Sequence, residues 1–176
     1  LAGADIPKPI DGRPFLGNGA VTRDFTFGYA DRFDEKYDLV RWVRKGRFSY
    51  QRNYQPFNFD SLQNDYRYRQ LAYREWRQLY RAGKLNAAQR QFFEPRAAEA
   101  LYDIENDPHE VNNLAGDPGH AQTLAGLRSL LAAQVRRLND LSFFPEPYMV
   151  SEAMANPAKF GREHSGQIAR LIAIAD

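Results

Sequence analysis

The sequence LYDIENDPHEVNNLAGDP, residues 101–118, predicts a strand, a turn and the start of a helix in close succession. Residues 100–104 form a short apolar run with a tyrosine, which is typical of an edge strand. The tripeptide Asn-Asp-Pro at 106–108 indicates a turn, because aspartate bonds nearby backbone and proline fixes φ. Asp117 is then placed to cap a helix whose first position is Pro118.

The polar residues of this stretch are better explained by the turn than by chemistry. Asp107, His109 and Glu110 suit a hydrogen-bonded turn. The other two histidines, His120 and His164, are far from His109 in the sequence and have no partners at metal-ligand spacing. The sequence contains no HExxH, P-loop, GxSxG or GxGxxG pattern. We therefore expect no metal ligand and no catalytic residue in this chain.

The spacing of apolar residues predicts both strands and helices in the rest of the chain. On strand 38–44 neither set of alternate residues is wholly apolar, since Arg41 stands in one and Arg44 in the other. We therefore expect a sheet that is covered partly on both sides. The predicted strands are residues 24–30, 38–44 and 47–53, with a tight turn at 45–46, and the predicted helices are residues 62–83, 87–93, 118–139 and 168–175, with an extended segment at 143–147.

The helix at 118–139 carries the clearest apolar stripe. Such a stripe at helical spacing is typical of a helix that packs on a core. Its members are Ala121, Leu124, Leu127, Leu130, Leu131, Val135 and Leu138.

Composition limits the class of protein. The 176 residues are 43% hydrophobic and 14% aromatic with a formal net charge of +2, which is typical of a globular domain and calls for neither a nucleic-acid nor a membrane partner. There is no cysteine, which excludes disulfides and thiolate metal sites. No signal peptide and no apolar run near the roughly 20 residues of a membrane span is visible. The chain opens on Leu1 and its last helix reaches Asp176, so we expect more protein at both ends.

The helix at 62–83 interleaves tyrosine and arginine. This mixture suits single-stranded nucleic acid or an anionic sugar surface, because aromatic rings stack and guanidinium groups pair with phosphate or sulfate. It equally suits an amphipathic helix whose aromatic residues pack inward, since Tyr66, Tyr73 and Tyr80 lie close to one face. We favour packing and keep a carbohydrate- or nucleic-acid-binding module as the alternative function.

The loop DRFDEKYD, residues 31–38, is dense in charge and joins two predicted strands. A guanidinium fork and carboxylates at a strand end can bind a sulfate or a sugar hydroxyl. A solvated connection with weak local ion pairs is the simpler interpretation. If residues here contact substrate, we expect Asp31, Arg32 and Asp34 to do so.

Four segments together resemble the C-terminal part of formylglycine-dependent sulfatases. Residues 101–115 resemble the family segment LYDL…DPxExxNLA, and residues 1–17 are similar to LAGxxxP…DGxxFL. Residues 31–41 (DRFDEKYDLVR) look like a segment of many bacterial sulfatases that act on sulfated sugars. Residues 140–149 (DLSFFPEPYM) are similar to the tail of a bacterial branch related to N-sulfoglucosamine sulfohydrolases. The resemblance implies an alkaline-phosphatase-like α/β fold. This chain would supply an α+β subdomain, with a small antiparallel sheet packed by helices.

The resemblance also implies a function and a division of the chain. Family members hydrolyse sulfate esters or sulfamates, with a formylglycine made in a C/S-x-P-x-R motif and a calcium ion; neither motif nor calcium ligands are present here. The segment alone is therefore expected to be inactive. The parent would be an exported or periplasmic sulfatase acting on a sulfated saccharide, with the 31–38 loop near its substrate. The expected divisions are 1–60 (end of the catalytic domain and hairpin), 61–97 (helical insertion), 98–150 (subdomain strand and helix) and 151–176 (extension).

Overall fold

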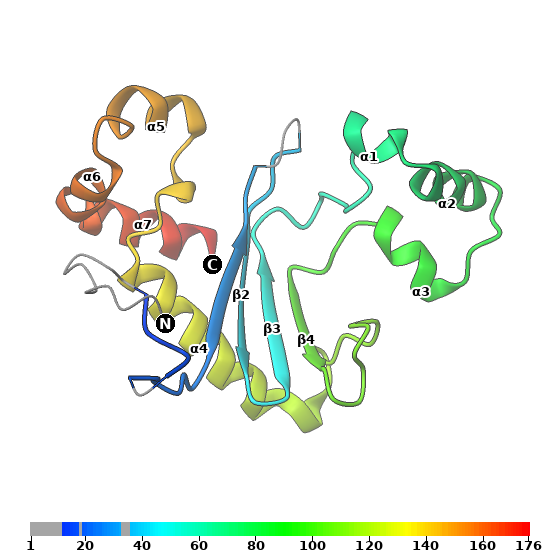
Figure 1. Cartoon of the computed structure of the whole chain (residues 1–176), viewed down its shortest axis with the longest axis horizontal. Helices are drawn as coiled ribbons and strands as arrows, with labels where there is room; N and C mark the ends of the chain where they lie inside the picture. Colours follow the sequence, from blue (N-terminus) through cyan, green and yellow to red (C-terminus); the bar gives the residue numbers. More distant parts are fainter. Residues whose placement is uncertain (1–11, 18, 33–35) are drawn as a thin grey trace.

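A four-stranded antiparallel sheet stands at the centre of the molecule (Figure 1). The computed structural model describes residues 12–17, 19–32 and 36–176, so the opening segment of the resemblance, residues 1–11, lies outside it. The strands run in the sequence order β1-β2-β3-β4, and β4 is an edge strand as residues 100–104 predict. Their bounds are β1 Thr26–Ala30, β2 Val40–Lys45, β3 Phe48–Asn53 and β4 Glu99–Asp103.

The turn between β2 and β3 confirms the predicted hairpin. Lys45 pairs with Phe48 across a two-residue connection. Its first residue, Gly46, has φ +58°, a conformation that a residue with a side chain rarely adopts.

One face of the sheet packs on the helix α4 (Ala121–Arg137) and on α7 (Ser165–Ala175) (Figure 1). The pairing register places Val43, Tyr50 and Leu101 in one row across three strands, and all three are buried in the core. This row meets the apolar stripe of α4, which is why both elements are stable only together. The buried helix residues are Leu124, Leu127, Leu131, Val135, Ile168 and Ile172.

The sequence predicts the start of α4 correctly but not its end. Asp117 accepts a hydrogen bond from the amide of Gly119 and caps the short helix η2 (Pro118–His120), which confirms the predicted helix start. At the other end Leu138 is 45% exposed. It follows the last turn of α4 and lines a cavity rather than the core, so the predicted stripe is one residue too long there.

The opposite face of the sheet is covered by its own side chains and a loop. A side chain at Gly28 would overlap the ring of Trp42 on the neighbouring strand, so Trp42 lies flat over this glycine. Gln51 donates a hydrogen bond to Glu110 in the loop that follows β4. Helices therefore cover one face of the sheet, whereas side chains of the sheet and a loop cover the other.

The predicted helix at 62–83 is wrong in one respect, because the structure breaks it in two. Helix α1 is Asp65–Arg69 and α2 is Leu71–Arg81, with Gln70 between them in an extended conformation (φ −74°, ψ 132°). Helix α3 (Ala87–Arg90) begins at the predicted cap Asn86 and continues as η1 (Gln91–Phe93). The break turns α2 so that its aromatic residues meet those of η1, and tertiary packing outweighs helix continuity here.

The segment after α4 is helical where an extended chain was predicted. After η3 (Leu141–Phe143) come α5 (Glu146–Glu152) and α6 (Pro157–Glu163). The prediction of an extended segment at 143–147 fails because Pro147 occupies the first turn of α5, where a proline is tolerated. The predicted last helix is confirmed by α7. No helix in the described part of the chain combines the length and the apolarity needed to cross a bilayer.

Candidate functional site

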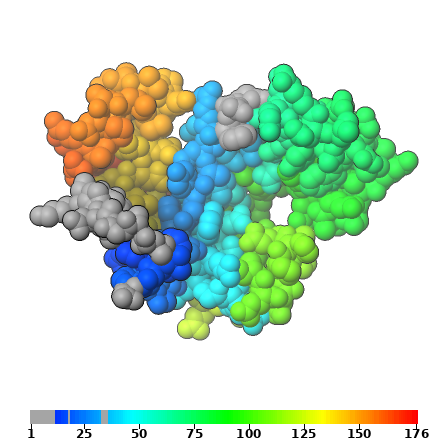
Figure 2. All heavy atoms as spheres, in the orientation of Figure 1, coloured from blue at the N-terminus to red at the C-terminus, as the bar shows by residue number. Residues whose placement is uncertain are grey.

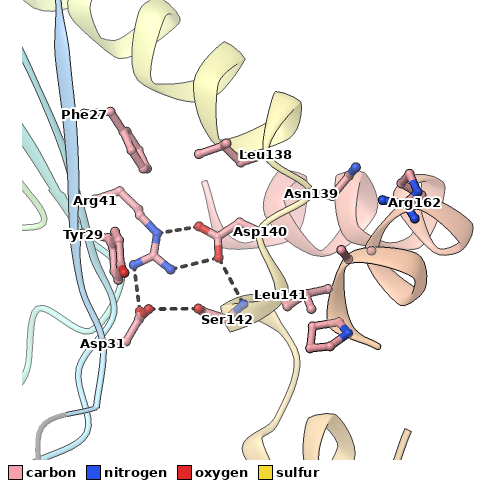
Figure 3. A pocket seen from close by; sticks show the side chains of 13 residues that line it. Phe27, Tyr29, Asp31, Arg41, Leu138, Asn139, Asp140, Leu141, Ser142 and Arg162 are labelled. Carbon is pink, nitrogen blue, oxygen red and sulfur yellow. Dashed lines mark hydrogen bonds and ion pairs between the residues drawn. The ribbon is translucent and has the colours of Figure 1, made fainter. Parts of the chain in front are cut away.

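A buried arginine organises a polar site between the sheet and the end of α4. Arg41 lies on β2 with its side chain on the α4 side of the sheet, and only 1% of its surface is exposed. Its Nε and Nη2 donate to the two carboxylate oxygens of Asp140 at 2.5 and 3.0 Å. Its Nη1 donates to Asp31 Oδ1 at 2.8 Å and to the carbonyl of Val40 at 2.7 Å (Figure 3).

The two aspartates are themselves held in place. Asp140 caps η3 by accepting a hydrogen bond from the amide of Ser142 at 3.1 Å, and the hydroxyl of Ser142 donates to Asp31 at 3.0 Å. Burial alone would lower the pKa of Arg41, but the hydrogen bonds and charges of Asp140 and Asp31 outweigh it, so the pKa is raised. The guanidinium therefore remains charged and fixed in one orientation.

A cavity of about 460 Å³ opens beside this ring of polar groups. The aromatic side chains Phe27 and Tyr29 of β1 form one wall, and α6 forms another with Arg162 (Figure 3). Arg162 is exposed, and no hydrogen bond or ion pair joins its guanidinium to another residue that the structure describes. The complete lining is Phe27, Tyr29, Asp31, Arg41, Leu138, Asn139, Asp140, Leu141, Ser142, Pro157, Ala158, Gly161 and Arg162.

A local backbone feature brings α6 close to the cavity. Asn139 has φ +49°, a left-handed conformation that ends the chain's helical course after α4. Gly161 of α6 approaches it so closely that an added side chain would lie 3.4 Å from Asn139 Cβ. This close packing sets Arg162 beside the end of α4.

The structure treats the three predicted substrate residues differently. Asp31 lines the cavity, but both of its carboxylate oxygens accept hydrogen bonds from within the chain. Arg32 pairs with Glu146 of α5 and is not part of the lining. Asp34 lies outside the described residues.

Sequence reasoning missed the residues around Asp31. Arg41 could have been found from the sequence, because strand alternation places it on the same face as Val43. A buried arginine on that face must have a charged or polar partner. Asp140 also gave a signal, as a capping residue in the sequence Asp-Leu-Ser. Arg162 gave none, since it is one of many surface arginines.

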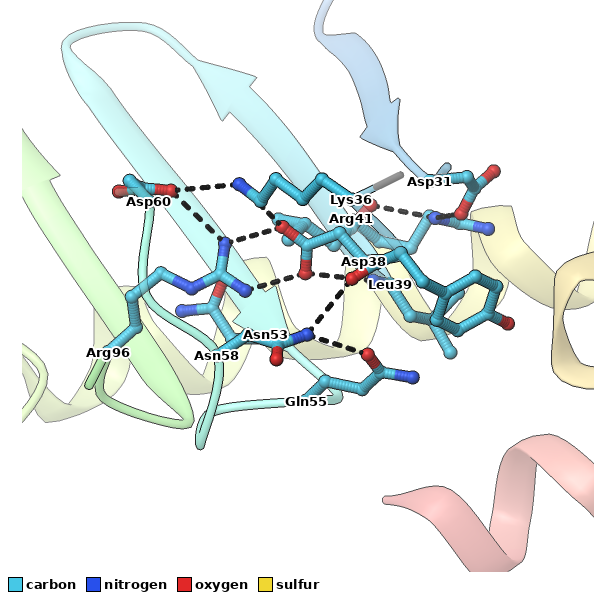
Figure 4. A network of polar contacts seen from close by, with 12 residues as sticks. Asp31, Lys36, Asp38, Leu39, Arg41, Asn53, Gln55, Asn58, Asp60 and Arg96 are labelled. Carbon is cyan, nitrogen blue, oxygen red and sulfur yellow. Dashed lines mark hydrogen bonds and ion pairs between the residues drawn. The ribbon is translucent and has the colours of Figure 1, made fainter. Parts of the chain in front are cut away.

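A second network of polar contacts lies at the C-terminal end of the loop 31–38 (Figure 4). Asp38 is 3% exposed and accepts two hydrogen bonds from Arg96 at 2.9 and 2.6 Å. Lys36 lies 3.3 Å from the same carboxylate and 3.5 Å from Asp60. Burial would raise the pKa of Asp38, but the hydrogen bonds and charge of Arg96, with Lys36, outweigh it and lower the pKa. This network joins the start of β2 to both ends of the helical excursion between β3 and β4.

A third polar cluster lines a cavity of about 580 Å³ between the sheet and α4. Arg128 of α4 donates to both oxygens of Glu99 at 2.7 Å, and the hydroxyl of Tyr50 donates to Glu99 at 2.5 Å. The hydrogen bond from Arg128 lowers the pKa of Glu99. These groups satisfy one another and fasten α4 to the sheet.

The described residues do not fit a calcium ion. Across residues 12–17, 19–32 and 36–176, no three histidine, aspartate or glutamate side chains gather in a way that could hold a metal. The carboxylates of Asp31, Asp38 and Asp140 face arginines instead of one another. Calcium prefers several unpaired oxygens at one point.

The chain is similar to known sulfatases. No protein-family model matches it. It is 36% identical over 154 residues to an ulvan-active sulfatase from Formosa agariphila, a match that covers 86% of this chain and 26% of that protein. The chain thus spans about a quarter of this relative's length and corresponds to its C-terminal part. A solved structure of a candidate sulfatase from Bacteroides thetaiotaomicron is 21% identical, covering 66% of this chain and 17% of that one, with a TM-score of 0.39; a likeness at that level carries no argument.

Proposed function

The chain belongs to the sulfatase family and matches the C-terminal part of its relative, and on that premise we propose that the protein hydrolyses sulfate esters or sulfamates of a sulfated saccharide. The observation that carries the proposal is the 36% identity over 154 residues to a sulfatase named as ulvan-active. That name supports a sulfated saccharide as the substrate class.

We assign the catalytic residues of this proposed reaction to sequence outside these 176 residues. The chain contains no cysteine and no serine in the pattern S-x-P-x-R, so it offers no precursor of formylglycine. In the proposal, the formylglycine nucleophile and the calcium ion are both held elsewhere in the protein. The present segment alone would then release no sulfate, and calcium-dependent turnover by the purified segment would contradict this division of labour.

The Arg41 cavity is the part of this chain that we assign to the saccharide. Aromatic faces such as those of Phe27 and Tyr29 stack on sugar rings, and the guanidinium of Arg162 matches an anionic substituent. Asp31 acts in this proposal by fixing Arg41 and Ser142. The neighbouring Arg32 and Asp34 are proposed as substrate contacts from the same loop.

The test uses the full-length protein and measures sulfate release from sulfated oligosaccharides, ulvan-derived ones first. Removing one charge-assisted contact through Arg162→Gln should raise KM by about tenfold and leave kcat nearly unchanged. The matched control is Arg170→Gln on α7, which is also exposed but lies outside the cavity lining. The absence of sulfate release from every sulfated saccharide would overturn the function, whereas an unchanged KM in Arg162→Gln would overturn only the role of the cavity.

A further inference from the structure

The helical excursion between β3 and β4 carries a net positive charge, although the rest of the chain is net negative. We call residues 62–94 the arm. It stands on the opposite side of the sheet from α5, α6 and α7 in Figure 1 and forms a separate lobe in Figure 2. Seven arginines and lysines against three acidic residues give the arm a net charge of +4, while the rest of the chain has a net charge of −2.

The charges on α2 are arranged as a stripe. Arg74, Arg77 and Arg81 are spaced i, i+3 and i+7, so they share one side of the helix over roughly 10 Å. Arg74 and Arg81 are exposed, and their guanidinium groups make no hydrogen bond or ion pair with any residue in the described ranges. Their charges are therefore open to a ligand from solvent.

Arg77 is held in a fixed position between them. Its guanidinium lies 3.8 Å from the centre of the Tyr68 ring and donates to Gln63 at 3.2 Å. A guanidinium that is already ordered loses less conformational freedom when it binds an anion. The stripe thus combines two exposed guanidinium groups with one that is already held in place.

Apart from Tyr66, which is 68% exposed, most aromatic residues of the arm pack against one another. Trp76 stacks on Phe92 with ring centres 4.4 Å apart, and Tyr80 stacks on Phe93 at 4.5 Å. Tyr73 lies 6.0 Å from Phe92 on the same side. Binding of single-stranded nucleic acid depends on several free aromatic faces, and these rings do not offer them.

We infer that the Arg74–Arg77–Arg81 stripe binds an anionic polysaccharide chain. Repeated sulfate or carboxylate groups along such a chain complement a row of guanidinium groups, and they need no stacking platform. The stripe lies outside the cavity lining, so it would hold a polymer at a second place on the molecule. The inference does not depend on sulfatase chemistry, since it concerns retention of the polymer and not its hydrolysis.

The experiment measures the affinity of the full-length protein for dextran sulfate, with neutral dextran and a 20-nucleotide poly(dT) as comparison probes. The double variant Arg74→Gln/Arg81→Gln should bind dextran sulfate at least about tenfold more weakly near 0.1 M salt. The plot of log affinity against log salt should become less steep, its slope smaller in magnitude by about two. The reason is that binding releases about one counterion fewer for each arginine that is removed. The charge-matched control Arg137→Gln/Arg170→Gln changes exposed residues of α4 and α7 and should stay within about twofold of wild type. Circular dichroism of both variants checks that the helices remain.

Two results would overturn the inference. Equal weakening in the two double variants would mean that overall charge, not the stripe, governs binding. Tighter binding of poly(dT) than of dextran sulfate at equal charge concentration would assign the arm to nucleic acid. Sulfate release is measured separately. If the protein binds dextran sulfate but releases sulfate from no saccharide, this inference stands and the proposed function is overturned.

Discussion

Replacement of Arg41 by methionine tests whether the buried arginine holds the two sides of the cavity together. The substitution keeps an apolar stem of similar length but removes two hydrogen bonds to Asp140 and one to Asp31. Hydrogen bonds to charged groups contribute about 1.5–3 kcal/mol each. Because solvent reaches part of Asp31, which is 28% exposed, the sum is an upper bound. Breaking a buried ion pair by removing one partner costs about 3–5 kcal/mol, and we expect a loss in that range.

Urea unfolding at pH 7, followed by circular dichroism, measures this loss. For a chain of this size a loss of about 4 kcal/mol corresponds to a fall in Tm of roughly 10 °C. The control is Arg44→Met on the same strand, where the side chain is exposed and the change should stay within about 0.5 kcal/mol. The additional change Asp140→Asn should recover part of the loss, because it removes one of the carboxylates left without a cation.

A stability loss below about 1 kcal/mol at pH 7 would refute the view that Arg41 neutralises Asp31 and Asp140.

Three further outcomes are expected. The folded-state pKa of Asp38 is lowered, so its contribution to stability is complete above its unfolded pKa and is lost as the pH falls through the folded value. Asp38→Asn should therefore be much less stable than wild type at pH 7, and urea unfolding across pH should show this difference shrinking as the pH falls below the unfolded pKa. Leu131→Ala should cost about 2–5 kcal/mol because the side chain is fully buried, whereas Leu138→Ala should cost less than about 1 kcal/mol, and thermal unfolding that shows equal losses would contradict this placement of the core. Gly28→Ala should cost about 1–3 kcal/mol and alter the tryptophan fluorescence, since the new methyl group must displace the ring of Trp42; an unchanged spectrum and stability would exclude that contact.

Local patterns were sufficient for most of the secondary structure. The hairpin, the edge strand at 100–104, the cap at Asp117 and the stripe of α4 all depend on residues within a few positions of one another. Capping, turn chemistry and hydrophobic periodicity act over that range, which is why a single sequence reveals them.

The arm shows where local reasoning fails. The residues around Gln70 have no strong helix breaker, so a continuous helix is the natural prediction. The structure ends α1 at this residue because Trp76 and Tyr80 then reach Phe92 and Phe93. The stacking of these four large rings, of which Phe93 is buried and the others are half-buried, outweighs the loss of a few helical hydrogen bonds.

By itself the sequence determined the four strands, the helices α4 and α7 and the resemblance to the C-terminal part of the sulfatases, and these are supported. Only the tertiary structure decided the cavity. Arg41 meets Asp31 ten residues away and Asp140 ninety-nine residues away, and Arg162 comes to the same place from a helix that the sequence did not predict. The physical reason is that a buried guanidinium must be neutralised by whichever carboxylates the packing of sheet and helices brings to it, and that choice is made in three dimensions.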